Sequence, residues 1–190
     1  MIAAEVSDEV LMDRYCAGDV AAFSMLFHRY ARRLVRFVQP YTGPASAEDC
    51  VQQTFMNVHA SRGSFRAGAR VAPWLFAIAR NQAIDLTRSA PRRREVADGD
   101  ERATQTATDA RVHDRGLDRA VREAIGALPD DQRDVVTLHW LGGLSFPEVA
   151  AVVGASPLAV RARATRAYTT LRTTLGPLAA ELSLPQEEAP

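Results

Sequence analysis

Arginines and small side chains share one face of a helix predicted near the C-terminal end of the chain. At about 100° per residue, the helix separates two sides. The apolar side comprises Val160, Ala164, Ala167 and Leu171. The opposite side comprises Arg161, Ala162, Thr165, Arg166, Thr169 and Arg172. Arginine contacts phosphates or pairs with guanine through two hydrogen bonds, and small side chains permit close approach. We predict that this face contacts double-stranded DNA; a solvated arginine face is the alternative.

A second set of polar and aromatic residues recurs at seven-residue steps in the helix that starts at Pro73. Trp74, Asn81 and Arg88 fall along one stripe, with Arg80 beside it. A basic loop precedes this helix and contains Phe65, Arg66 and Arg70. Bases stack on aromatic rings, amides bind exposed base edges, and guanidinium groups hold phosphates. The set favours single-stranded nucleic acid as a ligand, although packing alone would also account for Trp74.

A third set lies on the helix that follows Pro44 and carries acid and amide groups. Its members are Asp49, Gln52, Gln53 and Asn57. They share a face that holds no lysine or arginine, opposite an apolar side with Val51, Thr54 and Phe55. Such a face suits docking on another protein, and a plain solvated surface is the alternative.

Composition excludes several other functions. The 23 basic residues, all arginine, balance 23 acidic ones, so the chain is not basic overall. Its four histidines are scattered, and no paired carboxylates, HExxH, glycine-rich phosphate loop or GxSxG motif occurs. We therefore predict no catalytic residue, no metal ligand, no cofactor and no enzyme activity.

The N-terminal residues and the cysteines indicate a cytoplasmic location. Met1 to Val10 carries three acids where a signal peptide would have basic and apolar residues. No apolar run approaches the ~20 residues of a membrane span. Cys16 and Cys50 form no disulfide framework or CxxC motif, as expected in a reducing compartment.

The hydrophobic periodicity predicts an all-α fold with two small helical domains. An N-terminal helical bundle is expected over 1–90, a flexible linker over 91–114, a helix-turn-helix domain over 115–176 and a disordered tail over 177–190. The linker is predicted from its lack of aromatic residues and its few aliphatic ones. No strand signal occurs.

Local signals predict where several helices begin and end. Ser7 to Ala17 is expected to be a short helix that ends at Gly18, Asp19 to cap a longer one, and Pro40 to Pro44 to be a turn. Ser46 is expected to cap the following helix. Asp131 to Leu141 is predicted as one helix.

The helix-turn-helix has the clearest signals. Ser145 and Glu148 have capping-box spacing, Gly154 can end that helix in a left-handed conformation, and Ser156-Pro157 opens the next helix. This unit places its second helix in a DNA major groove.

Three ordered segments resemble those of the extracytoplasmic-function sigma factors, the small two-domain promoter-specificity subunits of bacterial RNA polymerase. SAEDCVQQTF at 46–55 is similar to the family's polymerase-binding helix, and PWLFAIARNQAID at 73–85 to its promoter-melting helix. LSFPEVAAVVG at 144–154, with VRAR at 160–163, is similar to its upstream-element recognition unit.

The resemblance implies specific roles for the three sets. Asp49, Gln52 and Gln53, with Asn57, would dock on the clamp coiled coil of core polymerase. Phe65, the loop from Arg66 through Arg70 to Ala72, and Asn81 would capture a flipped base of the −10 element, with Trp74, Arg80 and Arg88 nearby. The residues expected at the −35 element are Ser156, Arg161, Ala162, Arg163, Thr165 and Arg166.

Three residues depart from the family pattern. Gln53 stands where the family usually has Glu, which could weaken polymerase binding, and Ala162 stands where it often has Ser, which affects base preference. Pro147 lies in the first turn of its helix, where an amide has no helical partner to lose.

The resemblance implies an alternative sigma factor whose two domains recognise the −35 duplex and melt the −10 element. Family members are commonly held by an anti-sigma factor, so an inhibitory partner is expected. We also hypothesise that the free chain is inactive because its basic faces pack against each other, against the linker or against such a partner. The alternative interpretation is a helix-turn-helix regulator that acts without replacing sigma. Neither the promoter sequence nor the inducing signal can be predicted.

Overall fold

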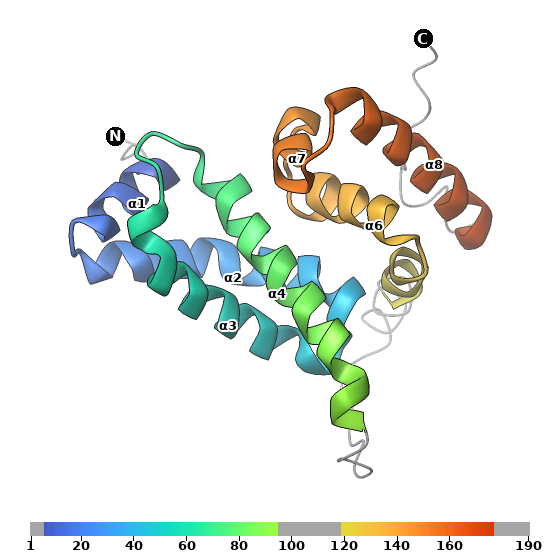
Figure 1. The fold of residues 1–190 in the computed structure, drawn as a ribbon, viewed down its shortest axis with the longest axis horizontal. Helices are drawn as coiled ribbons and strands as arrows, with labels where there is room; N and C mark the ends of the chain where they lie inside the picture. The colour runs from blue at the N-terminus through green and yellow to red at the C-terminus, as the bar shows by residue number, and fades with distance from the viewer. Residues whose placement is uncertain (1–5, 95–118, 177–190) are drawn as a thin grey trace, which may run out of the picture.

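Helices form all the regular secondary structure in the residues that the computed structural model describes, which are 6–94 and 119–176. We call these ranges the N-terminal unit and the C-terminal unit (Figure 1). The N-terminal unit comprises α1 (Asp8–Cys16), α2 (Val20–Thr42), α3 (Pro44–Ser61), the 3₁₀ helix η1 (Arg62–Ser64) and α4 (Val71–Arg94). In the C-terminal unit residues 119–126 are helical, followed by α6 (Asp130–Val136), the π-helix η2 (Thr137–Leu141), α7 (Phe146–Val153) and α8 (Pro157–Leu175). The all-α prediction is confirmed.

The long helix α2 is the centre of the N-terminal unit, because α1, α3 and α4 all pack against it. The Asp19 carboxylate accepts hydrogen bonds from the N–H groups of Ala21 and Ala22, which confirms the predicted cap. Its apolar stripe is buried, and Phe37 meets Phe76 of α4 edge-on, with 5.1 Å between ring centroids. This aromatic contact fixes the position of α4, which carries the second set of candidate residues.

The predicted turn from Pro40 to Pro44 is wrong, because α2 continues through Pro40 to Thr42. Phe37 and Val38 are fully buried just before the proline, and Tyr41 packs against the core just after it. Their burial outweighs the cost of about 3 kcal/mol for proline inside a helix. The predicted Ser46 cap is wrong too, since α3 begins at Pro44 after Gly43, without a side-chain cap.

The helix α4 extends to Arg94, four residues beyond the predicted domain limit at 90. Arginine favours helix, so the run before Arg94 prolongs it into the segment predicted as linker. The rest of the predicted linker and the predicted tail lie outside the described residues.

The predicted helix-turn-helix is confirmed. Gly154 ends α7 in the left-handed conformation at φ 67°, and the Ser156 hydroxyl accepts the Ala159 N–H to cap α8. The segment from Asp131 to Leu141 is helical throughout, in α6 and in η2 directly after it, and η2 is a π-helix because the Gly142 N–H bonds to Thr137 O, five residues back.

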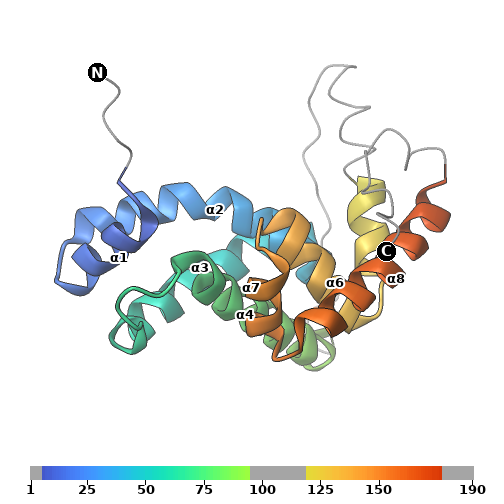
Figure 2. The ribbon, with the colours of Figure 1, turned by 90° about the horizontal axis from the view of Figure 1, so that it is seen from above.

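The two units pack directly against each other, α4 against α7 and α2 against η2 (Figures 1 and 2). Their buried apolar residues form one continuous cluster, which Val135, Leu138, Leu144 and Val149 enter from the C-terminal side. A second cluster lies inside the C-terminal unit and joins helix 119–126, α6 and α8. In this conformation the helices α4 and α8, which carry candidate sites, therefore lie in one continuously packed structure.

Candidate nucleic-acid interface and docking face

The helix α7, which precedes α8 in the helix-turn-helix, is capped at its first turn. The Glu148 carboxylate accepts hydrogen bonds from the backbone N–H of Ser145 at 2.8 Å and from its hydroxyl at 2.7 Å. Burial raises the pKa of Glu148, but these hydrogen bonds and the charge of Arg70 lower it by more, so the net direction is downward. Glu148 therefore stays ionised and holds the first turn of α7.

The outer face of α8 is open to solvent at four candidate positions, which are Arg161, Ala162, Thr165 and Arg166. The apolar residues on its other side are buried, as predicted. Arg163 is less exposed, because its guanidinium pairs with Asp131 of α6 at 3.2 Å. Ser156 is occupied as the cap. The four exposed positions can thus contact a groove, while Arg163 and Ser156 also stabilise the unit.

On α4 the structure brings part of the second set together. Trp74 packs edge-on against Phe65, with 5.1 Å between ring centroids, and both are half-buried. Asn81 and Arg88 are exposed on the same helix, and Arg66 is exposed on the preceding loop. Arg70 is 69% exposed and forms ion pairs with Glu9 at 3.3 Å and Glu148 at 3.6 Å.

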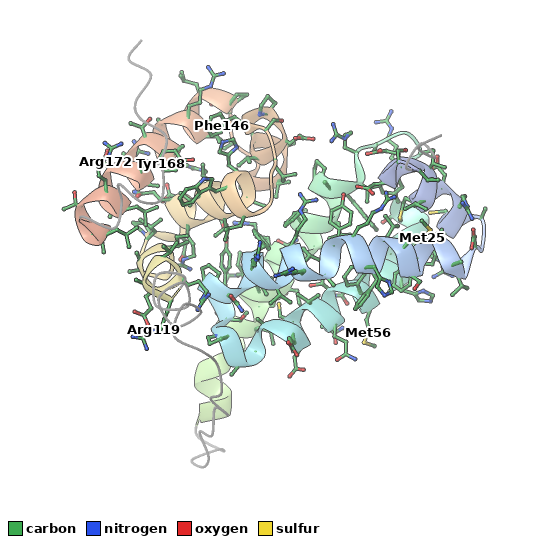
Figure 3. The ribbon with its side chains drawn as sticks, turned by 180° about the vertical axis from the view of Figure 1, so that it is seen from behind. Met25, Met56, Arg119, Phe146, Tyr168 and Arg172 are labelled. Carbon is green, nitrogen blue, oxygen red and sulfur yellow. The ribbon has the colours of Figure 1, made fainter. Side chains whose placement is uncertain are left out.

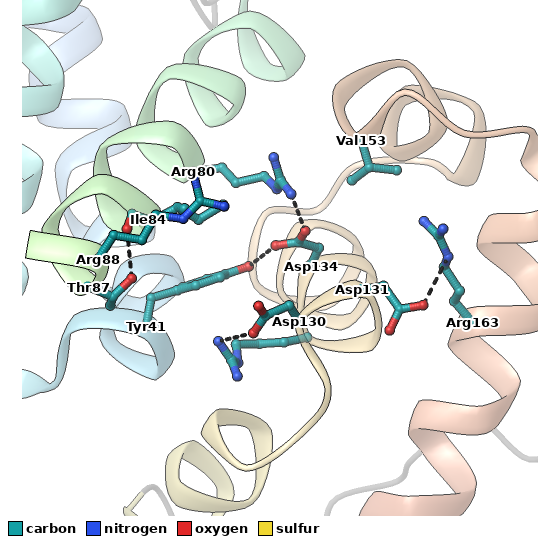
Figure 4. A pocket seen from close by; sticks show the side chains of 11 residues that line it. Tyr41, Arg80, Ile84, Thr87, Arg88, Asp130, Asp131, Asp134, Val153 and Arg163 are labelled. Carbon is teal, nitrogen blue, oxygen red and sulfur yellow. Dashed lines mark hydrogen bonds and ion pairs between the residues drawn. The ribbon is translucent and has the colours of Figure 1, made fainter.

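Arg80 differs from its neighbours, because it points into a cleft between the two units (Figure 4). The cleft has a volume of about 320 Å³ and lies between α4 and α6, with α8 at one side. There the Arg80 guanidinium forms an ion pair with Asp134 of α6. The side chains of Arg80 and Asp134 are only 23% and 6% exposed.

One partner of Asp134 was missed by the sequence patterns. The Tyr41 hydroxyl donates to Asp134 Oδ1 at 2.9 Å and lies 2.7 Å from the Thr137 hydroxyl. Burial first, and then the charge of Asp134, raise the pKa of Tyr41 well above 10. Tyr41 is separated from Asp134 by 93 residues, and no local pattern indicates such a contact.

The third set forms an exposed face on α3. Asp49, Gln52 and Gln53 are exposed, whereas Asn57 is half-buried. The Asn57 amide donates to Gln82 of α4 at 2.9 Å and accepts from Gln53 at 3.2 Å. Beside this face, Met56 is 60% exposed at the rim of an apolar groove lined by Phe23, Phe27 and Phe55 (Figure 3). The α3 face thus combines acid and amide groups with an apolar border.

Within 6–94 and 119–176, no three His, Cys, Asp or Glu side chains gather as metal ligands would. None of the helices in these ranges combines the length and apolar character that a membrane crossing needs. What the described surfaces offer is therefore contact chemistry: arginines, amides and aromatic rings on α4 and α8, and acid and amide groups on α3.

Two family models match the chain, and together they define the class of protein. Sigma-70 region 2 matches residues 26–93 and Sigma-70, region 4 matches residues 118–171. The first match contains the α3 face and the α4 candidates, and the second contains the α8 candidates. The chain thus has the two conserved regions of a sigma factor.

Curated relatives narrow the class to one family. The chain is 38% identical over 173 residues to the RNA polymerase sigma factor CarQ of Myxococcus xanthus, covering 90% of this chain and 99% of that protein. It is 29% identical to the ECF RNA polymerase sigma-E factor of Escherichia coli, covering 92% of this chain and 97% of that protein. The chain belongs to the extracytoplasmic-function (ECF) sigma factors, and it is an alternative sigma factor that directs transcription initiation.

Solved structures agree with this assignment. The structure of CnrH in complex with the cytosolic domain of CnrY matches with a TM-score of 0.70 at 27% identity, covering 88% of this chain and 96% of that one. The sigma factor RpoE in complex with the anti-sigma factor NepR, from Bartonella quintana, matches with a TM-score of 0.61 at 26% identity, covering 80% of this chain and 96% of that one.

Proposed function

We propose that the α3 face docks on the clamp coiled coil of core RNA polymerase. Asp49, Gln52 and Gln53 are exposed and lie within the sigma-70 region 2 match. Asn57 takes part from a fixed position, because its hydrogen bonds to Gln53 and Gln82 hold the amide in place. The exposed Met56 at the border of the face adds an apolar contact.

In the same proposal, the two units divide promoter recognition. The C-terminal unit, over 115–176, binds the −35 duplex through Arg161, Ala162, Thr165 and Arg166, with Ser156 and Arg163 at the edge of the contact. The N-terminal unit, up to about residue 90, captures the −10 strand. The observation that carries this division is the open face of α8, which presents two arginines and two small side chains above a buried apolar side.

Capture of the −10 strand would use residues of α4 and of the loop before it. A flipped base stacks on Phe65 or Trp74, worth about 1–3 kcal/mol per base, and offsets part of the cost of unstacking it from the duplex. Asn81 binds the exposed base edge, and Arg66, Arg70, Arg80 and Arg88 hold the phosphates. Duplex binding by α8 fixes the position, and the linker makes the second contact intramolecular.

The proposal includes where the chain acts and what regulates it. A subunit of this kind works in the cytoplasm with RNA polymerase and has no catalytic role of its own. Because a similar sigma factor was solved with an anti-sigma factor, we also propose an inhibitory protein partner for this chain.

Run-off transcription with core bacterial RNA polymerase tests the proposal. DNA from upstream of the chain's own gene serves as template, with and without the chain. We expect a discrete start that requires the chain, and we expect Asp49→Ala together with Gln52→Ala to abolish comigration with core on a sizing column. Arg36→Ala is the matched control, since this exposed residue lies outside all three sets.

No start site, together with no comigration with core, would contradict the proposal. Tight binding to an operator without polymerase would then favour a helix-turn-helix regulator that does not replace sigma. Comigration lost in the α3 variant but kept in Arg36→Ala would assign the docking face.

A further inference from the structure

A buried polar group of five residues joins the two units. We call it the interunit cluster, and it comprises Tyr41, Arg80, Arg133, Asp134 and Thr137. Tyr41 and Arg80 come from α2 and α4, and the other three from α6 and η2. Ion pairs that are both buried and made between separate units are uncommon, because each charge must leave water.

Asp134 uses both carboxylate oxygens in this cluster. Oδ1 accepts from the Tyr41 hydroxyl at 2.9 Å, and Oδ2 accepts from the Arg80 guanidinium. Both donors belong to the N-terminal unit, so these two protein partners of the carboxylate are present only while the units are packed together, and water replaces them when the units separate. The Arg133 guanidinium lies 5.4 Å from the Tyr41 ring centroid and covers the ring from the other side of the contact.

A second polar contact supports the same arrangement. Arg33 of α2 donates to the Gly142 carbonyl at 2.5 Å, while its guanidinium lies 5.2 Å from the Tyr30 ring centroid and 5.6 Å from that of Phe76. The N-terminal unit thus supplies arginine or tyrosine donors at two points, and the C-terminal unit supplies the acceptors.

The Arg80 guanidinium has two alternative partners. In the proposed function it holds a phosphate of the −10 strand, next to Asn81 on α4. In this structure a carboxylate takes that place through one contact, from Arg80 Nη2 to Asp134 Oδ2, and carboxylate and phosphate oxygens are both strong acceptors for a guanidinium. In the closed chain the pair with Asp134 keeps the Arg80 side chain in the cleft and only 23% exposed, so promoter DNA and Asp134 compete for Arg80.

The closed arrangement leaves two donors unused. Arg80 Nε and Arg133 Nε are buried without a hydrogen-bond partner among the described residues. A buried donor that is left unpaired is costly, so separation of the units regains part of the free energy lost with the ion pair. The closed conformation is therefore suited to reversible opening.

We propose that Asp134 is an internal competitor for the DNA-binding guanidinium of Arg80, and that the interunit cluster holds the free chain closed until polymerase separates the units. The inference rests on the proposed −10 role of Arg80. Closure lowers DNA binding because only the open fraction is competent: with about 90% of the chain closed, the apparent affinity falls about tenfold.

The test uses the full chain without polymerase and the substitution Asp134→Asn. Asparagine keeps an acceptor for Tyr41 but removes the charge that holds Arg80. We expect the radius of gyration from small-angle X-ray scattering to increase. We also expect binding of a fluorescent, mixed-sequence single-stranded DNA of about 12 nucleotides to tighten about tenfold. Circular dichroism verifies that the helices are retained.

Asp131→Asn is the matched control. Asp131 is the same residue type on the same helix, but it pairs with Arg163 inside the C-terminal unit. We expect no change in the radius of gyration and no gain in single-strand binding from this variant. Equal effects of both substitutions would overturn the proposal, since loss of any α6 carboxylate would then be sufficient.

Two further outcomes would also overturn it. An unchanged radius of gyration in a folded Asp134→Asn variant would show that the ion pair does not hold the units together. Expansion without tighter DNA binding would show that Asp134 does not compete for Arg80. Run-off transcription with Arg80→Ala separates this failure from that of the proposed function: reduced −10 opening upholds the promoter role of Arg80, whereas unchanged transcription rejects it.

Discussion

The two candidate DNA-binding helices differ in how the closed chain presents them. On α8 the candidate positions Arg161, Thr165 and Arg166 face solvent. On α4, Asn81 and Arg88 are also exposed, but Arg80, next to Asn81, is paired with Asp134 of the other unit. Packing of the two units therefore leaves the candidate duplex-binding face of α8 exposed. It engages one residue, Arg80, of the candidate strand-binding face on α4.

This difference suggests an order of events at a promoter. Duplex binding needs no separation of the units, whereas strand capture needs the Arg80 guanidinium to leave Asp134. Polymerase, by separating the units, would thus control the melting step more than the positioning step. Five substitutions can break or sharpen the comparison.

The largest effect is expected from Phe76→Ala, which tests whether the two helices belong to separately stable units. Phe76 is fully buried on α4 against Phe37. Its truncation should cost about 3–5 kcal/mol of unfolding free energy in the N-terminal unit. Trp74 and Trp140 lie one in each unit, so urea unfolding of Trp140→Phe and Trp74→Phe backgrounds reports the units separately.

We expect the Trp74 signal to move by the full amount and the Trp140 signal by less. If both transitions shift together, the shared apolar cluster makes the chain one cooperative unit. The contrast between α4 and α8 would then have to be attributed to local side chains alone.

Arg166→Ala tests the open face. A bidentate arginine contact to a base is worth about 1–3 kcal/mol, so promoter-dependent run-off at limiting chain should fall about 5-fold to 150-fold. Arg119→Ala is the control, because Arg119 is 75% exposed and pairs with Glu123 along its own helix. Since closure does not cover α8, the loss should be the same in an Asp134→Asn background. A smaller loss in that background would show that α8 is coupled to closure.

The same two helices show what sequence patterns can predict. Several signals that act within a few residues were reliable: Asp19 caps α2, Gly154 ends α7 in the left-handed region, and Ser156 caps α8, although the local signal for a cap at Ser46 was wrong. The buried side of α8 follows from its periodicity. These features depend on backbone hydrogen bonds and side-chain spacing that the local sequence fully specifies.

Predictions failed where distant packing decides the outcome. Pro40 and Pro44 together indicated a turn, but burial of Phe37 and Val38 keeps α2 helical to Thr42. Arg80 was predicted to lie beside its neighbours at the single-stranded nucleic acid, but it pairs with Asp134, which lies 54 residues away. A charge on a helix gives no local indication of a partner contributed by another unit.

Tyr41→Phe tests how much the Tyr41 hydroxyl stabilises the Asp134 carboxylate, without changing a charge. It removes the hydroxyl that bonds to Asp134 and Thr137, so we expect a loss of about 1–2 kcal/mol and a smaller expansion than in Asp134→Asn. Urea unfolding and scattering measure the two effects. Tyr168→Phe is the control, because the buried Tyr168 hydroxyl has no hydrogen-bond partner among the described residues and nothing is lost with it.

The pH dependence of this contribution follows from the direction of the pKa shift. Burial raises the pKa of Tyr41 above 10, so the folded chain holds the phenol proton more tightly than the unfolded chain. The stabilisation is complete below pH 10 and is lost as the pH rises through the raised value. Tyr41→Phe should lack this alkaline loss. Equal alkaline loss in both chains would place its origin elsewhere.

A smaller effect is expected at Glu148, where a cap and an exposed interunit ion pair meet. Glu148→Gln weakens the acceptor for Ser145 and should cost about 1 kcal/mol near neutral pH. Because the folded pKa of Glu148 lies below 4.5, this contribution is present above that value and is lost as the pH falls through the lower folded value. Urea unfolding of the two chains should therefore converge in acid.

Arg70→Ala removes the interunit partner of Glu148 and leaves the cap. Arg70 is 69% exposed and 3.6 Å from Glu148, and exposed pairs of this kind contribute about 0–1 kcal/mol. We therefore expect scattering of Arg70→Ala to match that of the unmodified chain, in contrast to Asp134→Asn. The two ion pairs join the same units and differ mainly in burial. If Arg70→Ala increased the radius of gyration as much as Asp134→Asn, burial of the Asp134 ion pair would not explain why Arg80 on α4 is paired while the candidate face of α8 stays exposed.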